Sequence, residues 1–262
     1  MAAIIGQNGT NHLGVNLSFT KFLFVTPRQD DDGAHAKMRQ VGACIARGFF
    51  NDFDAESGHD APPHETIQFL VTSGFRSSDG LGAARYAAQV CSKYRPRLDD
   101  IEAELRRRVG DCGEVVSLDG AIRVPQYTSA ELYAYAYKPA PPRTTGRTVR
   151  NAIIIPVNKK PAWWALDPLN RHAYFYPSQN GHGGHARSVE AGITSVYKKI
   201  YHHPDGHGID GQFDFISYFE CADEHLPVFD AICQNLRNVE RNPEWKYVEE
   251  GPEWRGHRVL RW

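Results

Sequence analysis

The feature that most constrains the fold of this chain is a proline-rich segment near its middle. Residues 138–148 (KPAPPRTTGRT) combine three prolines with a glycine and show no apolar period, which is typical of a linker. The segment predicts a boundary between an N-terminal half, residues 17–140, and a C-terminal half, residues 149–262. With 262 residues, the chain is long enough for a sizeable core in each half.

The N-terminal half alternates strand and helix patterns. Segments rich in β-branched and aromatic residues predict strands, and apolar residues at helical spacing predict helices. The predicted strands are Phe19–Val25, Thr66–Thr72 and Leu132–Tyr137, and the predicted helices are Met38–Phe49 and Leu98–Val109. Gly110 is expected to end the second helix.

The C-terminal half shows a similar order of elements. Its predicted strands are Asn151–Val157, Gly192–His202, Phe213–Phe219 and His257–Leu260, and its predicted helices start at Pro161 and at Asp223. Asp223 is a suitable N-cap for the second of these helices. Two halves of similar order predict an α+β fold, which we interpret as two tandem ferredoxin-like repeats with facing antiparallel sheets.

Charge and composition exclude several classes of function. The net charge is −1, so there is no electrostatic case for a nucleic acid or an anionic membrane as partner. No apolar run approaches the length of a transmembrane helix. The N-terminus lacks the basic and apolar regions of a secretory signal, and the five cysteines form no CxxC pair. We therefore expect a cytoplasmic protein with reduced thiols.

Histidines are unevenly distributed. Six of the twelve lie in one region of the C-terminal half: His182, His185, His202, His203, His207 and His225. Such clustering favours a metal centre, although no spacing among them fits a known non-heme triad. Some of these histidines can instead belong to a solvated loop and the end of a hairpin, which suits His203 and His207.

Two segments of the C-terminal half resemble the chlorite dismutase family. The first is IPVNKKPAWW, residues 155–164, with Pro168 and Arg171 beyond it. The second is VYKKIYHHPDGHGIDGQFDFISYFE, residues 196–220. The resemblance extends over about residues 150–242. In the first half only the order of elements and the stretch FLVTSGFRSSD, residues 69–79, are similar.

The resemblance implies heme b bound through a histidine. In that family the histidine lies thirteen residues before a distal arginine; Lys198 takes the place of the arginine, and the same count leads to His185. His182 stays open as an alternative, because the segment after Arg171 is longer than the family pattern. Gly181, Gly183 and Gly184 would let the backbone come close to a flat macrocycle.

Further site residues follow from the same resemblance. A glutamate near the end of the last helix holds the axial histidine in the family; Glu240 stands there, with Glu244 as the alternative. Trp163 matches a tryptophan that lines the heme, whereas Trp164 is expected to serve packing. Lys159 and Lys160 either pair with the heme propionates or are simply solvated.

Lys198 is the main departure from the family pattern. Strand alternation places it on the face of Val196 and Ile200, away from Lys199; a slip by one residue would exchange the two lysines. An ammonium lacks the bidentate fork of a guanidinium, but it can still bind an anion or transfer a proton. We therefore expect Lys198 to be catalytic and the chain to be a poor chlorite dismutase.

These features predict a heme b-dependent oxidoreductase that acts on a small substrate. As in the family, it is expected to form a homo-oligomer, either a dimer or a pentamer. Three alternatives stay open: a true chlorite dismutase, a non-catalytic heme carrier or sensor, and a coproheme decarboxylase. The last requires a reactive tyrosine, for which the candidates are Tyr127, Tyr133, Tyr135 and Tyr137.

Overall fold

The computed structural model describes residues 18–29, 31–51, 53, 65–74, 80–122, 149–175 and 183–262. The predicted linker at 138–148, the predicted strand at 132–137, His182 and the four candidate tyrosines lie outside these residues. Where the two halves join is therefore still a prediction. Within the described residues, no helix is long and apolar enough to cross a membrane.

The N-terminal half has the strand and helix order of a ferredoxin-like repeat. Its elements are β1 (Phe19–Pro27), α1 (Asp32–Ile45), β2 (Phe50–Asn51), β3 (Thr66–Thr72), β4 (Tyr86–Ser92), α2 (Arg95–Val109) and β5 (Gly113–Ala121). The main strands pair antiparallel in the order β3-β4-β1-β5. Gly110 ends α2 with a φ of 52°, a left-handed conformation that favours glycine.

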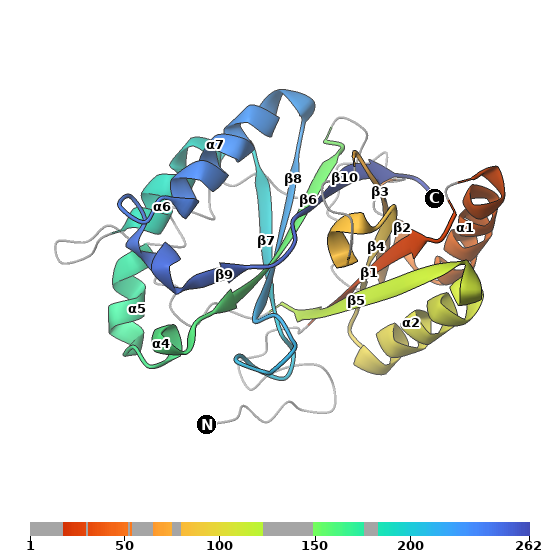
Figure 1. Cartoon of the computed structure of the whole chain (residues 1–262), viewed down its shortest axis with the longest axis horizontal. Helices are drawn as coiled ribbons and strands as arrows, with labels where there is room; N and C mark the ends of the chain where they lie inside the picture. Colours follow the sequence, from red (N-terminus) through yellow and green to blue (C-terminus); the bar gives the residue numbers. More distant parts are fainter. Residues whose placement is uncertain are drawn as a thin grey trace.

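The C-terminal half repeats this plan with a longer first connection (Figure 1). Its elements are β6 (Asn151–Lys159), α4 (Pro161–Trp164), α5 (Pro168–Phe175), α6 (Gly184–Val189), β7 (Tyr197–His202), β8 (Phe215–Cys221), α7 (Leu226–Arg237), β9 (Val248–Glu250) and β10 (Trp254–Val259). The strands pair in the order β7-β8-β6-β10, which is the equivalent of the order in the first half. The expected fold of two ferredoxin-like repeats is confirmed.

The two sheets join at both edges. β5 pairs with β7 through Ala121 and His202, and β10 pairs with both β3 and β6. The eight main strands therefore form a closed antiparallel ring rather than two separate facing sheets. Closure removes the unpaired edges that an open sheet would expose.

Three apolar cores follow from this closure. One fills the inside of the ring and takes residues from all eight strands, among them Phe22, Tyr218 and Trp254. A second lies between the first half's sheet and helices α1 and α2. The third packs α7 against β6, β8 and Val196, which directly precedes β7. Figure 1 shows the helices on the outside, α1 and α2 at one end and α4 to α7 at the other.

One predicted helix start differs from the structure. α7 begins at Leu226 after a short 3-10 turn, and the Asp223 side chain makes no capping bond. Asp223 instead accepts hydrogen bonds from Arg150 and Asn151 at the start of β6. The cationic partner of this carboxylate, Arg150, directly precedes β6 and is distant in the sequence, so the local sequence does not reveal it.

Candidate functional site

A cluster of polar side chains lies on the helix-facing side of the second half's sheet. Along β6, Ala152 and Ile154 point into the ring, while Ile153 and Ile155 face the helices. Since side chains alternate along a strand, Lys159 at the end of β6 also faces the helices. The residues around it come from α4, α5, α6 and the 3-10 turn Pro243–Tyr247.

Helix α6 places His185 against that turn. Gly183 precedes the helix with a φ of 53°, a conformation that suits glycine. A Cβ on Gly184 would lie 2.4 Å from the backbone oxygen of Arg241, so only glycine permits this approach. The glycines therefore bring α6 close to the chain at residues 241–243, which fixes the position of His185.

Glu244 joins His185 to Lys159. The His185 Nδ1 lies 2.7 Å from Glu244 Oε2, and Lys159 Nζ pairs with Glu244 Oε1. The side chains of Glu244 and Lys159 are 4% and 7% exposed. Burial raises the pKa of Glu244, but Lys159 and His185 outweigh it and hold that pKa at about 2. Glu244 is therefore an ionised acceptor between two donors.

This arrangement sets the tautomer of His185. Burial lowers the pKa of His185 below its ordinary value, although Glu244 acts in the opposite direction. The imidazole is therefore neutral, and its single proton lies on Nδ1 because an ionised carboxylate can only accept. Nε2 is then the unprotonated nitrogen, and its lone pair points away from Glu244.

Lys198 lies opposite that lone pair. Its neighbour Val196 packs in the helix-side core, while Tyr201 packs inside the ring, so Lys198 faces the helices as strand alternation predicts. Its Nζ lies 3.4 Å from His185 Nε2. Burial lowers the pKa of Lys198 below its ordinary value, against the opposing effects of Glu244 and Cys233.

Aromatic rings border the cluster. Trp163 is fully buried, and Lys159 Nζ lies 4.3 Å from the centroid of its ring. The centroid of the Phe175 ring lies 5.1 Å from the centroid of the His185 ring. Trp164 does not border this cluster. Its ring stacks on that of His207, with 4.4 Å between the ring centroids. The rings of Trp163 and Phe175 exclude water from one side of the site.

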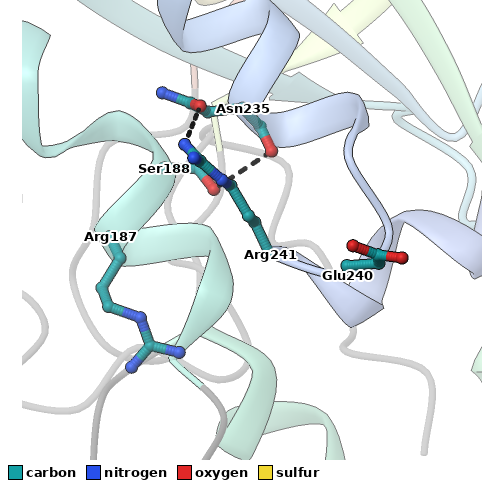
Figure 2. Close-up of a pocket in the computed structure, with 5 residues that line it drawn as sticks. All are labelled: Arg187, Ser188, Asn235, Glu240 and Arg241. Atoms are coloured by element: carbon teal, nitrogen blue, oxygen red, sulfur yellow. Dashed lines mark hydrogen bonds between the residues drawn. The ribbon is translucent and has the colours of Figure 1, made fainter.

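The structure brings together three of the four predicted site residues: His185, Trp163 and Lys198. Glu240 is not among them. It is exposed and lines a surface pocket of about 290 Å³ between α6 and the end of α7. Figure 2 shows this pocket, in which Arg241 reaches Asn235 while Glu240 stands apart. The assignment of Glu240 as histidine partner is wrong, and the alternative, Glu244, occupies that position.

The physical reason is the way the last helix ends. α7 ends at Arg237, and Asn238 accepts hydrogen bonds from the backbone N–H groups of Glu240 and Arg241. The chain therefore turns outward at Glu240 and returns inward at Glu244. Phe175 was missed because no sequence pattern distinguishes it from other aromatic residues at a helix end.

The remaining histidines form no metal centre in the described part of the chain. No group of three or more His, Cys, Asp and Glu side chains is placed to hold a metal ion among those residues. His202 Nδ1 and His207 Nε2 form a pair at 3.2 Å. That pair lies beside Trp164, apart from the His185 cluster.

The fold of this chain is similar to those of several solved structures. The chain matches no protein-family model. It is similar to the solved structure of chlorite dismutase from Candidatus Nitrospira defluvii in complex with imidazole, with a TM-score of 0.64 and 18% identity, covering 92% of this chain and 91% of that one. A variant of that enzyme with arginine replaced by lysine gives the same values.

A further solved structure, provisionally called a chlorite dismutase, has a TM-score of 0.61 and 13% identity, with 93% of this chain and 95% of that chain covered. These similarities extend over both halves, whereas the sequence resemblance is good over about residues 150–242 and weak in the first half. The chain therefore has the fold of the chlorite dismutases.

Proposed function

We propose that this chain is a divergent member of the chlorite dismutase family that binds one heme b through His185 and acts on a small substrate. The observation that carries the proposal is the orientation of His185, whose Nδ1 is held by Glu244 while Nε2 faces Lys198. Axial histidines commonly donate their second nitrogen to a carboxylate, which orients the ring and increases its basicity.

The donor set fits heme. A neutral imidazole whose Nε2 is unprotonated is an ordinary axial ligand. Trp163 would line the macrocycle, and Glu244 would fix the ligand from behind. When bound, the heme iron supplies the redox chemistry. The protein supplies orientation, exclusion of water by Trp163 and Phe175, and the Lys198 amine opposite the ligand.

The presence of Lys198 in place of the distal arginine favours a reaction other than efficient chlorite conversion. Conversion of chlorite to chloride and dioxygen requires the hypochlorite formed on the way to be retained. A lysine offers a point charge on a flexible stem, whereas an arginine offers two fixed parallel donors. Lys198 can bind a small anion or move a proton at its Nζ, and we assign it this catalytic role. We further expect a cytoplasmic homo-oligomer, a dimer or a pentamer as in the family it resembles.

Titration of the purified chain with hemin tests the proposal. We expect a Soret band that saturates at one heme per chain and is lost in His185→Ala. Glu244→Gln should weaken hemin affinity about tenfold to hundredfold, the usual effect of removing the partner of a metal-binding histidine. Glu240→Gln is the matched control, because its side chain is exposed, and it should bind hemin like the unmodified protein.

Two results would contradict the proposal. An unchanged Soret band in His185→Ala together with its loss in His182→Ala would transfer the ligand role to His182. Failure of the folded, unmodified chain to bind hemin would remove the heme assignment altogether.

A further inference from the structure

Three aromatic side chains pack against one another beside the His185 site. The ring centroid of Trp163 lies 5.7 Å from that of Tyr174 on α5 and 5.5 Å from that of Tyr247, the last residue of the 3-10 turn. The two tyrosine rings meet edge to face, with 5.8 Å between their centroids. All three separations fall in the range of about 4.5–7 Å that is usual for aromatic rings in contact, so each ring contacts the other two.

This aromatic cluster extends from the candidate site to the protein surface. At the inner end, Trp163 is fully buried, and its ring centroid lies 5.8 Å from that of Phe175, whose ring borders His185. At the outer end, Tyr174 and Tyr247 are half-buried, so part of each residue is open to solvent. Aromatic rings in contact therefore connect the buried site with the surface.

The two tyrosines differ in how easily each releases its phenolic proton. A hydrogen bond from Tyr174 and the ammonium of Lys246 lower the pKa of Tyr247 below its ordinary value, and Lys246 Nζ lies 4.8 Å from the centroid of the Tyr247 ring. Burial raises the pKa of Tyr174. A tyrosine that loses an electron also loses its phenolic proton, so Tyr247 is the more easily oxidised of the two.

From this arrangement we propose that Trp163, Tyr174 and Tyr247 form an electron-transfer path, through which the heme site oxidises a small phenolic reductant at the surface. The inference rests on the proposed heme binding and adds an outer reaction site to it. Tryptophan and tyrosine are the aromatic side chains that give up an electron most easily. A reductant that contacts Tyr247 at the surface need not enter the buried site.

The reaction balances with a peroxide as the oxidant. Hydrogen peroxide takes up two electrons and two protons, its O–O bond breaks, and two molecules of water form. Two phenol molecules supply these, because each loses one electron and one proton as its O–H bond breaks. Within the path, Tyr247 passes an electron to Trp163 and its proton to water. The phenol then returns one electron and one proton, which re-forms the O–H bond of Tyr247.

A phenol suits the outer end of this path. Exchange of a hydrogen between the oxygens of two phenols breaks one O–H bond and forms another of the same kind, so the exchange needs little driving force. The protein's contribution is to orient the rings and to keep water from the inner end, whereas the bound heme supplies the oxidising power.

Electron paramagnetic resonance tests the path without an activity assay. The hemin-loaded chain is mixed with an equimolar amount of hydrogen peroxide and frozen within seconds, and we expect the signal of a tyrosyl radical. The double variant Tyr174→Phe with Tyr247→Phe keeps both rings, and it should bind hemin but lose the signal. Tyr247→Phe alone should lose most of it. Tyr94→Phe is the matched control, because Tyr94 is 63% exposed and lies in the first half, and it should keep the signal.

Guaiacol, a small phenol, gives an independent readout. Its addition after peroxide should shorten the lifetime of the tyrosyl signal in the unmodified chain. The double variant should oxidise guaiacol more slowly than the unmodified chain does, whereas Tyr94→Phe should oxidise it at an unchanged rate.

The outcomes separate this inference from the heme assignment. Heme bound through His185 without a tyrosyl signal after peroxide would overturn the path and leave the proposed function intact. A signal that persists in the double variant would assign the radical to another tyrosine, and equal rates of guaiacol oxidation would remove the outer site; either result overturns the inference. Absence of hemin binding in the folded, unmodified chain would overturn both.

Discussion

The ion pair between Glu244 and Lys159 offers a quantitative test of the site in the heme-free protein. Replacing Glu244 with glutamine preserves its volume but removes its charge. The amide oxygen can accept one hydrogen bond, and its NH2 group then faces a second donor, either His185 Nδ1–H or Lys159 Nζ. The variant therefore leaves a buried ammonium without a counter-charge and a donor without an acceptor.

The expected cost follows from burial. Removing one partner of a buried ion pair typically costs 3–5 kcal/mol, because the remaining charge stays buried. The fall in the pKa of Glu244 from 4.5 to about 2 corresponds to roughly 3 kcal/mol of stabilisation of its ionised form. We therefore expect Glu244→Gln to lower the free energy of unfolding by about 3 kcal/mol at pH 7.

Urea denaturation followed by circular dichroism measures this loss. Both halves contribute to the core inside the ring, so we expect one cooperative transition. With a slope near 3 kcal/mol/M, the midpoint should fall by about 1 M urea.

Two further variants make the reasoning testable. Glu240→Gln, at an exposed position, should change stability by no more than about 0.5 kcal/mol. The double variant Glu244→Gln with Lys159→Met should recover most of the loss, because no charge is then left buried. A loss below about 1 kcal/mol in Glu244→Gln, or no recovery in the double variant, would refute this account.

Three further predictions concern packing, acid stability and substrate. Gly184→Ala should displace α6, destabilise the chain by about 1–3 kcal/mol and weaken hemin binding. Gly74→Ala is the control, because no atom lies within 4 Å of a Cβ at that position, and it should change neither stability nor hemin binding. Hydrogen bonds from Lys21 and other donors outweigh burial and lower the pKa of Glu102 to about 2. Its stabilisation is thus present above pH 4.5 and lost as pH falls towards 2, and in urea unfolding the stability gap to Glu102→Gln should close over that range; a constant gap would contradict this. Oxygen-electrode traces with chlorite should show slow release and heme bleaching, with longer-lived release in Lys198→Arg; rapid, sustained release by the unmodified, hemin-loaded protein would contradict this assignment.

Local patterns in the sequence predicted most of the elements. β3 was predicted with its observed bounds, and β1, β6 and α2 were found to within a few residues. β4 was missed because all of its residues are buried. A strand covered on both faces shows no alternation of polar and apolar residues. β5 was also missed, since its few apolar residues include the exposed Val116.

Some features of the candidate site follow from the sequence alone, and others depend on contacts between distant parts of the chain. The face of the strand on which Lys198 lies follows from alternation alone, and the thirteen residues between it and His185 are a property of the chain. Neither requires knowledge of distant contacts. The partner of His185 does, because Glu240 and Glu244 differ only in how the chain turns after α7, and Asn238 decides that turn.

Tertiary structure alone decided the closure of the ring and the geometry of the site. The pairings of β5 with β7 and of β10 with β3 join strands from different halves, and sequence periodicity carries no information about pairing over such separations. The 3.4 Å between Lys198 and His185 likewise results from packing α6 against residues 241–243 and from the position of β7 in the sheet. Periodicity in a sequence determines which face a side chain occupies, whereas the distance between two faces depends on every element packed between them.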